Sequence, residues 1–68
     1  MEECIVYFTD GKEVLVRGQS IYWTWYESEK NVVFWLESDF ENEDDVKIAE
    51  FCKACVMGIV RVSAKSEV

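Results

Sequence analysis

The fold is decided by residues 20–37, which read Ser-Ile-Tyr-Trp-Thr-Trp-Tyr-Glu-Ser-Glu-Lys-Asn-Val-Val-Phe-Trp-Leu-Glu. This stretch holds all three tryptophans, and aromatic and β-branched residues fill both flanks of a polar centre at 27–31. Such residues fit the pleated surface of a β-sheet, and a polar break between two runs of them is typical of a hairpin. The sequence therefore predicts an antiparallel hairpin against which the other strands lie.

A turn centred on Glu29 and Lys30 would set the pairing of this aromatic hairpin. One face is then wholly apolar, and we expect it to be core: it pairs Trp25 with Phe34 and Trp23 with Leu36. The other face is amphipathic and pairs Tyr26 with Val33, Thr24 with Trp35 and Tyr22 with Glu37. A slip by one residue would exchange the two faces, so burial of the apolar face should fix the register.

A second hairpin is predicted upstream, where the runs 4–8 and 13–17 flank Thr-Asp-Gly-Lys. Asp-Gly between two such runs is a strong signal for a two-residue type I′ turn. On the side that we take as core, this turn pairs Ile5 with Val16 and Tyr7 with Val14. The opposite side pairs Val6 with Leu15 and Phe8 with Glu13, after which Gly18 and Gln19 bend the chain into the aromatic hairpin.

The C-terminal third allows two interpretations. Near-helical spacing of apolar residues, with Asp44 or Asp45 as N-cap, would give a helix around 44–57; the spaced residues are Val46, Ala49, Cys52, Val56 and Ile59. The other interpretation is a strand over 46–51, a tight corner over 52–55 and a strand over 56–63, with fraying of 64–68.

The second interpretation is supported by a resemblance. The run Ile-Ala-Glu-Phe, the polar corner after it and the run Val-Met-Gly-Ile-Val resemble the closing hairpins of small all-β proteins of bacteria and their phages. We therefore expect one all-β domain over residues 1–68, an antiparallel meander of about six short strands that curls into a small barrel or half-barrel. The alternative is an α+β fold, a sheet with one C-terminal helix around 44–57.

The charge of the chain bears on its partners. Acidic residues number 14 and basic residues 7, with no histidine, so the formal net charge is −7. This charge disfavours direct binding to nucleic acid phosphates and favours a basic protein partner, although it would also serve solubility alone.

The expected cellular location of the protein rests on the lack of export signals in the sequence and on the number of cysteines. No apolar run approaches the roughly 20 residues of a membrane span, and the acidic start Met-Glu-Glu does not resemble a signal peptide. Three cysteines, an odd number, argue against a secreted disulfide scaffold. We therefore expect no membrane association, and a cytoplasmic protein with reduced thiols.

Most catalytic chemistry is excluded by composition. Without histidine there is no Ser-His-Asp or Cys-His centre, and the isolated glycines at 11, 18 and 58 exclude a phosphate-binding P-loop or Rossmann turn. Cys52 and Cys55 form a C-x-x-C pair that lacks the β/α setting of a redox helix, and Cys4 would supply only a third zinc thiolate. We expect no enzyme, no cofactor and no metal, and two semi-buried structural cysteines.

Two groups of residues are candidates for contacting a partner. One group is aromatic and lies on the amphipathic face of the hairpin: Tyr22, Tyr26 and Trp35. Curling of the sheet or a homodimer would be other ways to cover these side chains. The other group lies in a connection that we expect to be mobile and solvated: Asp39, Phe40, Glu41, Glu43, Asp44 and Asp45. Phe40 would either cap the core or anchor a partner.

The acidic group of residues suggests how the protein could act on a partner. Its spacing is not that of a calcium-binding helix–loop–helix loop, whereas clustered carboxylates can imitate the phosphates of DNA. The preferred function is therefore a small, acidic, non-catalytic binding protein that acts by protein–protein contact, for example a phage or mobile-element inhibitor of a host defence or nucleic-acid-binding protein. The alternative is sequestration of a small molecule or nucleotide in an aromatic pocket lined by Trp23, Trp25 or Trp35.

Overall fold

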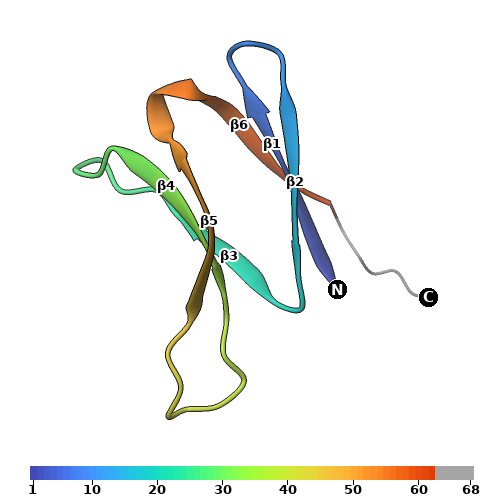
Figure 1. Cartoon of the computed structure of the whole chain (residues 1–68), viewed down its shortest axis with the longest axis vertical. Coiled ribbons are helices and arrows are strands. Elements are labelled where there is room, and N and C mark those ends of the chain that lie inside the picture. Colours follow the sequence, from blue (N-terminus) through green and yellow to red (C-terminus); the bar gives the residue numbers. More distant parts are fainter. Residues whose placement is uncertain (63–68) are drawn as a thin grey trace.

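Within residues 1–62, six β-strands pair into two three-stranded antiparallel sheets, and one 3-10 helix connects two of the strands (Figure 1). The computed structural model describes residues 1–62. Sheet A has the order β2 (Glu13–Gly18), β1 (Glu2–Phe8), β6 (Val56–Val62). Sheet B has the order β3 (Ile21–Thr24), β4 (Asn31–Leu36), β5 (Val46–Cys52). The predicted all-β fold is confirmed, although the two sheets do not close into a barrel within the described residues.

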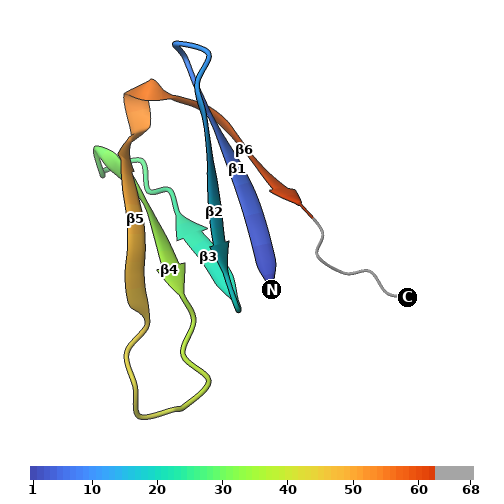
Figure 2. The ribbon, with the colours of Figure 1, turned by 45° about the vertical axis from the view of Figure 1, so that its right-hand side comes forward.

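The chain passes between the sheets at two short connections. β2 runs into β3 through Gln19 and Ser20, and β5 runs into β6 through the 3-10 helix η1 (Lys53–Cys55). The second view, Figure 2, shows β2 and β3 meeting at one corner and β5 and β6 meeting at η1. Across the described residues, no helix is long and apolar enough to cross a membrane.

The C-terminal strands and the corner between them are confirmed, and the alternative helix around 44–57 is wrong. The physical reason lies in β4, which pairs with β3 on one side and with β5 on the other. A helix at 44–57 would leave the backbone N–H and C=O groups on one side of β4 without hydrogen-bond partners. Residue 63 of the predicted last strand, and the fraying predicted for 64–68, lie outside the described residues.

The core lies between the two sheets. Its buried side chains come from both sheets and are Cys4, Val6, Val16, Ile21, Val32, Phe34 and Val56. Phe34 is fully buried, and its ring centroid lies 5.7 Å from that of Trp23 and 5.9 Å from that of Phe51. Phe51 also meets Phe8 of sheet A at 5.3 Å, so one aromatic series joins the sheets. Such pairs add about 0.5–1.5 kcal/mol each beyond their buried area.

The predicted register of the β1–β2 hairpin is wrong by one residue. Cys4 pairs with Val16 and Val6 with Val14, so the core face carries Cys4 and Val6 rather than Ile5 and Tyr7. The turn explains the shift, because Phe8 N–H donates to Lys12 O (2.9 Å) and Gly11 N–H donates to Phe8 O (3.0 Å). Among residues 1–62, Gly11 alone has positive φ, at 92°, which fits a three-residue loop rather than the expected two-residue type I′ turn.

The predicted register of the aromatic hairpin is wrong by two residues, which leaves its faces unchanged. Trp23 pairs with Phe34 and Tyr22 with Trp35, and the connection takes all of residues 25–30. Because side chains alternate with a period of two, Trp23 and Phe34 still point into the core as predicted. Trp25 does not, since it lies beyond the end of β3 and is 46% exposed.

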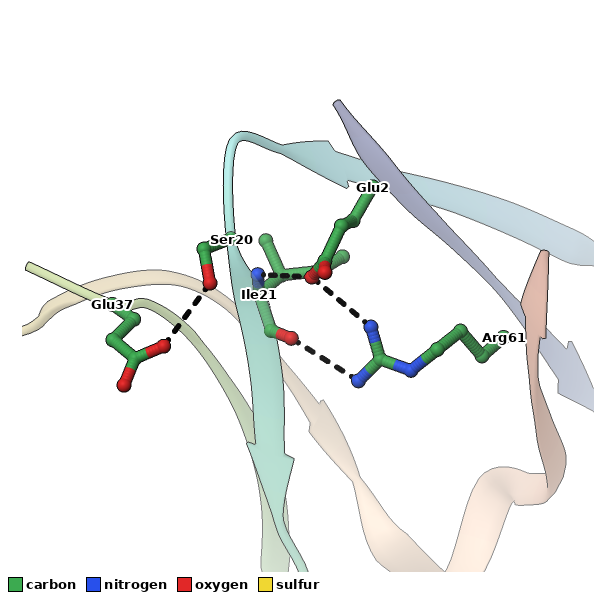
Figure 3. Close-up of polar contacts among 5 residues, drawn as sticks. All are labelled: Glu2, Ser20, Ile21, Glu37 and Arg61. Carbon is green, nitrogen blue, oxygen red and sulfur yellow. Dashed lines mark hydrogen bonds and ion pairs between the residues drawn. The ribbon is translucent and has the colours of Figure 1, made fainter. Parts of the chain in front are cut away.

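A polar contact holds the edge of sheet A to the start of β3 (Figure 3). Ile21 N–H donates to Glu2 Oε1 at 2.8 Å, and Arg61 donates both to that oxygen and to Ile21 O, each at 3.1 Å. Both backbone groups of Ile21 are thereby satisfied, as buried backbone requires. Beside this contact, Ser20 Oγ donates to Glu37 Oε1 at 3.1 Å. The bond from Ile21, with a smaller effect of Arg61, holds the pKa of the Glu2 carboxyl below its usual value.

Candidate partner-binding site

Residues 37–45 connect β4 to β5 and extend beyond both sheets, at the end of the molecule opposite η1 (Figure 1). We call this connection the acidic loop. Asp45 closes it: one carboxylate oxygen accepts the backbone N–H of Ser38 (2.8 Å), and the other accepts the hydroxyl of Tyr22 (2.5 Å). The loop that we expected to be a mobile connection therefore has its two ends joined through one side chain.

The same bonds change two pKa values. The hydroxyl of Tyr22 and, to a lesser degree, the N–H of Ser38 stabilise the ionised form of Asp45, so the pKa of this carboxyl is lowered. The hydrogen bond to Asp45 raises the pKa of Tyr22 to about 12, because the donor must keep its proton for the bond to exist. Tyr22 and Asp45, both predicted to contact a partner, therefore use their polar atoms to position the loop.

Phe40 is held at the surface of the acidic loop. Its N–H donates to Ser38 Oγ at 3.1 Å, while that hydroxyl donates to Phe40 O at 3.2 Å. Phe40 O also accepts the N–H of Glu43 at 3.2 Å, which forms a turn. The Phe40 side chain is 65% exposed, so it does not cap the core. The interpretation of Phe40 as a cap of the core is therefore wrong, and its role as an anchor for a partner stays a prediction.

An open groove of about 240 Å³ lies beside the loop. Its lining combines apolar side chains, carboxylates and small polar groups: Leu36, Phe40, Val46, Glu37, Asp39, Glu43, Asp44, Gln19 and Ser38. Four predicted residues, Asp39, Phe40, Glu43 and Asp44, are brought together here, whereas Glu41 is exposed without lining the groove.

Sequence reasoning missed two of the three apolar residues of this groove, Leu36 and Val46. Leu36 was assigned to the core and Val46 to the start of a strand, and nothing in their local pattern shows that they flank a loop. The exposure of Val46, at 56%, becomes visible only when β5 is paired with β4.

The residues of the predicted aromatic surface come from β3, β4 and the 25–30 connection. Tyr22 and Trp35 lie opposite each other on the outer face of sheet B and are half-buried, and Trp35 Nε1–H donates to Thr24 Oγ1 at 3.3 Å. Tyr26 is 60% exposed but belongs to the 25–30 connection, where its carbonyl accepts a bond from Lys53 Nζ of η1. The backbone of Tyr26 therefore lies near η1, while its phenol group is close enough to Tyr22 to contribute slightly to the raised pKa of that residue.

The cysteines are also arranged differently from expectation. Cys4 is buried in the core, and burial raises the pKa of its thiol. Cys52 and Cys55 are exposed, and not semi-buried as predicted, because they lie at the corner where β5 ends and η1 begins, and η1 has no buried residue. Within residues 1–62, no three or more metal-binding side chains come together.

The chain was compared with known proteins. No protein family model matches it, and no curated protein or solved structure matches it either.

Proposed function

We propose that this chain is a non-catalytic binding protein that captures a basic segment of a partner protein at the groove beside the acidic loop. The observation that carries this proposal is the combination of one exposed, backbone-fixed aromatic residue, Phe40, with the carboxylates of Asp39, Glu43 and Asp44 on a single groove.

The chemistry of the groove suits lysine or arginine side chains. Both have an aliphatic stem that packs on apolar surface and a cationic head that stays near water and carboxylates. Here the stem would lie against Leu36, Phe40 and Val46, and the head would reach the carboxylates around them. Arginine would gain most, because its planar guanidinium both stacks on an aromatic ring and binds carboxylates in a bidentate manner.

The groove is small for a sequestered ligand. Its volume of about 240 Å³ is less than the roughly 300–1,000 Å³ typical of small-molecule pockets. A side chain of a partner protein fits such a space, and the net charge of −7 would accelerate the encounter with a basic surface. A host defence or nucleic-acid-binding protein, whose surface is built to meet phosphates, is the kind of partner that such an acidic loop would inhibit.

The test is a titration with a synthetic peptide of alternating arginine and leucine, measured by calorimetry at several salt concentrations. The Phe40→Ala variant should weaken binding about tenfold, since a central aromatic anchor contributes more than about 1 kcal/mol. The triple variant Asp39→Asn, Glu43→Gln, Asp44→Asn should weaken binding further and flatten its dependence on salt.

The matched control neutralises three exposed glutamates elsewhere on the surface, Glu13→Gln, Glu27→Gln and Glu29→Gln. It changes the net charge by the same amount, so it should retain most of the affinity. Met57→Ala, at a residue 72% exposed on β6, serves as the apolar control. Equal losses in both triple variants would mean that net charge alone attracts the peptide, and the proposed site would be wrong.

A further inference from the structure

The exposed C-x-x-C pair is the one motif that the proposed function leaves unused. Cys52 is the last residue of β5 and the N-cap of η1, and Cys55 is the last residue of η1. In a 3-10 turn, side chains three residues apart lie on the same side of the helix. Both thiols are exposed at this corner, and each of them shifts the pKa of the other.

Backbone contacts hold the corner from both sides. Lys53 N–H donates to Lys30 O at 2.9 Å, and Thr9 N–H donates to Cys55 O at 2.9 Å. The side chain of Lys53 continues into the 25–30 connection, where its ammonium donates to Tyr26 O at 2.5 Å and lies 5.9 Å from the Trp25 ring centroid. The two thiols are therefore presented by a turn that is tied to both sheets.

The two cysteines differ in their surroundings. A groove of about 410 Å³ is lined by Cys52, together with Glu27, Glu29, Lys30, Lys53 and Ala54, and Cys55 is not among its lining residues. The backbone N–H of Ala54 and, next, the thiol of Cys55 lower the pKa of Cys52. The same interaction raises the pKa of Cys55. Cys52 thus has a backbone N–H that favours its thiolate, and it has open space beside it.

We propose that Cys52 and Cys55 are a reversible dithiol–disulfide pair that reacts with low-molecular-weight disulfides, with Cys52 attacking and Cys55 resolving. This site lies at the end of the molecule opposite the acidic loop and is independent of the function proposed for that loop (Figure 1).

The reaction is two successive thiol–disulfide exchanges. The Cys52 thiolate attacks one sulfur of the small disulfide, a mixed disulfide forms on Cys52, and one small thiolate leaves. The Cys55 thiolate then attacks the Cys52 sulfur, the protein disulfide forms, and the second small thiolate leaves. In total, the protein dithiol is oxidised by two electrons and one small disulfide is reduced to two thiols. The groove beside Cys52 gives room for the substituent of the mixed disulfide.

The test treats the reduced, folded protein with oxidised glutathione and follows the intact mass. The unmodified chain should lose two hydrogens without gaining glutathione, and Cys4, which is buried, should react only after unfolding. The Cys55→Ser variant should accumulate a stable mixed disulfide on Cys52. In the Cys52→Ser variant, the adduct on Cys55 should form about tenfold more slowly, because no groove adjoins Cys55 to take the substituent of the mixed disulfide.

Two controls separate the folded corner from ordinary thiol chemistry. Circular dichroism establishes that both serine variants keep the sheet fold. A peptide of residues 51–57 should form its disulfide with an equilibrium constant at least about tenfold smaller, because its turn is not held by the contacts to Lys30 and Thr9. Equal constants for protein and peptide, a faster reaction at Cys55 than at Cys52, or a mixed disulfide that Cys55 never resolves would each overturn the proposal.

Discussion

At the scale of single residues, Phe34 is the side chain on which both sheets depend. It is fully buried on the central strand of sheet B, where it meets Trp23 on β3 and Phe51 on β5. Phe51 in turn meets Phe8 of sheet A. The removal of Phe34 would therefore interrupt this series of aromatic contacts between Trp23 and Phe51.

Phe34→Ala should therefore cost about 3–5 kcal/mol of the free energy of unfolding, the range for truncating a buried phenylalanine. A domain of this size rarely has more than about 3–5 kcal/mol, so the variant should be largely unfolded at room temperature. Phe34→Leu should fold with a loss of about 1–2 kcal/mol, because it removes fewer buried carbons. Urea denaturation measures both, and Met57→Ala should change stability by no more than about 0.5 kcal/mol. A Phe34→Ala variant as stable as Met57→Ala would contradict this packing.

The bond between Tyr22 and Asp45 predicts how stability changes with pH. The pKa of Asp45 is lowered from 3.8 in the folded state, so its contribution is present above about pH 4 and is lost as pH falls through the lowered value. The pKa of Tyr22 is raised from 10.0 to about 12, so its contribution is complete below pH 10 and is lost as pH rises toward 12.

Urea denaturation across pH 3–7 and pH 9–12 tests this bond. The difference in stability between the unmodified chain and Asp45→Asn should shrink at both ends of the range. With Tyr22→Phe, the loss between pH 10 and pH 12 should be smaller than in the unmodified chain. If Asp45→Asn follows the same acid and alkaline curves as the unmodified chain, the hydroxyl of Tyr22 does not bind Asp45 in solution.

At the scale of elements, the corner between β2 and β3 depends on Gly18. A Cβ at this position would lie 2.5 Å from Ile21 Cγ2 and 3.0 Å from Leu36 Cδ1, both of which are side chains of sheet B. Because Gly18 has no side chain, the end of β2 can approach these two side chains of sheet B closely. At Gly58 of β6, by contrast, a Cβ would meet nothing within 4 Å.

This difference makes a matched pair of substitutions. Gly18→Ala should destabilise the protein by about 1–3 kcal/mol, the usual cost of forcing extra atoms into a packed site. Gly58→Ala should be neutral or should stabilise by up to about 1 kcal/mol, because alanine restricts the unfolded chain more than glycine does. Thermal and urea unfolding of both variants provide the measurement, and equal effects would mean that the corner is looser than the structure shows.

The elements themselves were largely predictable, and their registers were not. Alternation along 20–37 placed Trp23 and Phe34 on the core face, because side-chain direction in a strand depends only on the parity of position. The partner across the hairpin depends on loop length, and Asp-Gly permits both a two-residue and a three-residue loop. The sequence therefore left the register of Val16 against Cys4 open by one residue.

At the scale of the whole molecule, the net charge of −7 opposes folding through self-repulsion. The acidic loop adds to this cost, since Asp39, Glu43 and Asp44 lie around one groove. A site that gathers like charges for a partner is expected to reduce stability when the partner is absent.

Salt should therefore act in opposite directions on folding and on binding. Raising sodium chloride from about 20 mM to about 150 mM should raise the thermal midpoint by a few degrees and weaken the arginine peptide complex. Neutralising Asp39, Glu43 and Asp44 takes the net charge from −7 to −4, so this variant should start with a higher midpoint and respond less to salt. Differential scanning calorimetry of both proteins checks this, and a midpoint that falls with salt would show that attractive ion pairs dominate.

The sequence by itself determined the strands of the two hairpins, the core face of the aromatic hairpin and the acidic character of the 37–45 connection, because these follow from neighbouring residues and from the period of two. It left the region around 44–57 open between strand and helix, and the pairing of β5 with β4 decided that question. Only the tertiary structure decided the rest. Tyr22 and Asp45 are 23 positions apart, and their bond closes the loop. The groove beside Phe40 and the exposed pair at η1 likewise depend on how the strands pair and cross between the sheets, and such contacts between distant positions leave no local pattern in the chain.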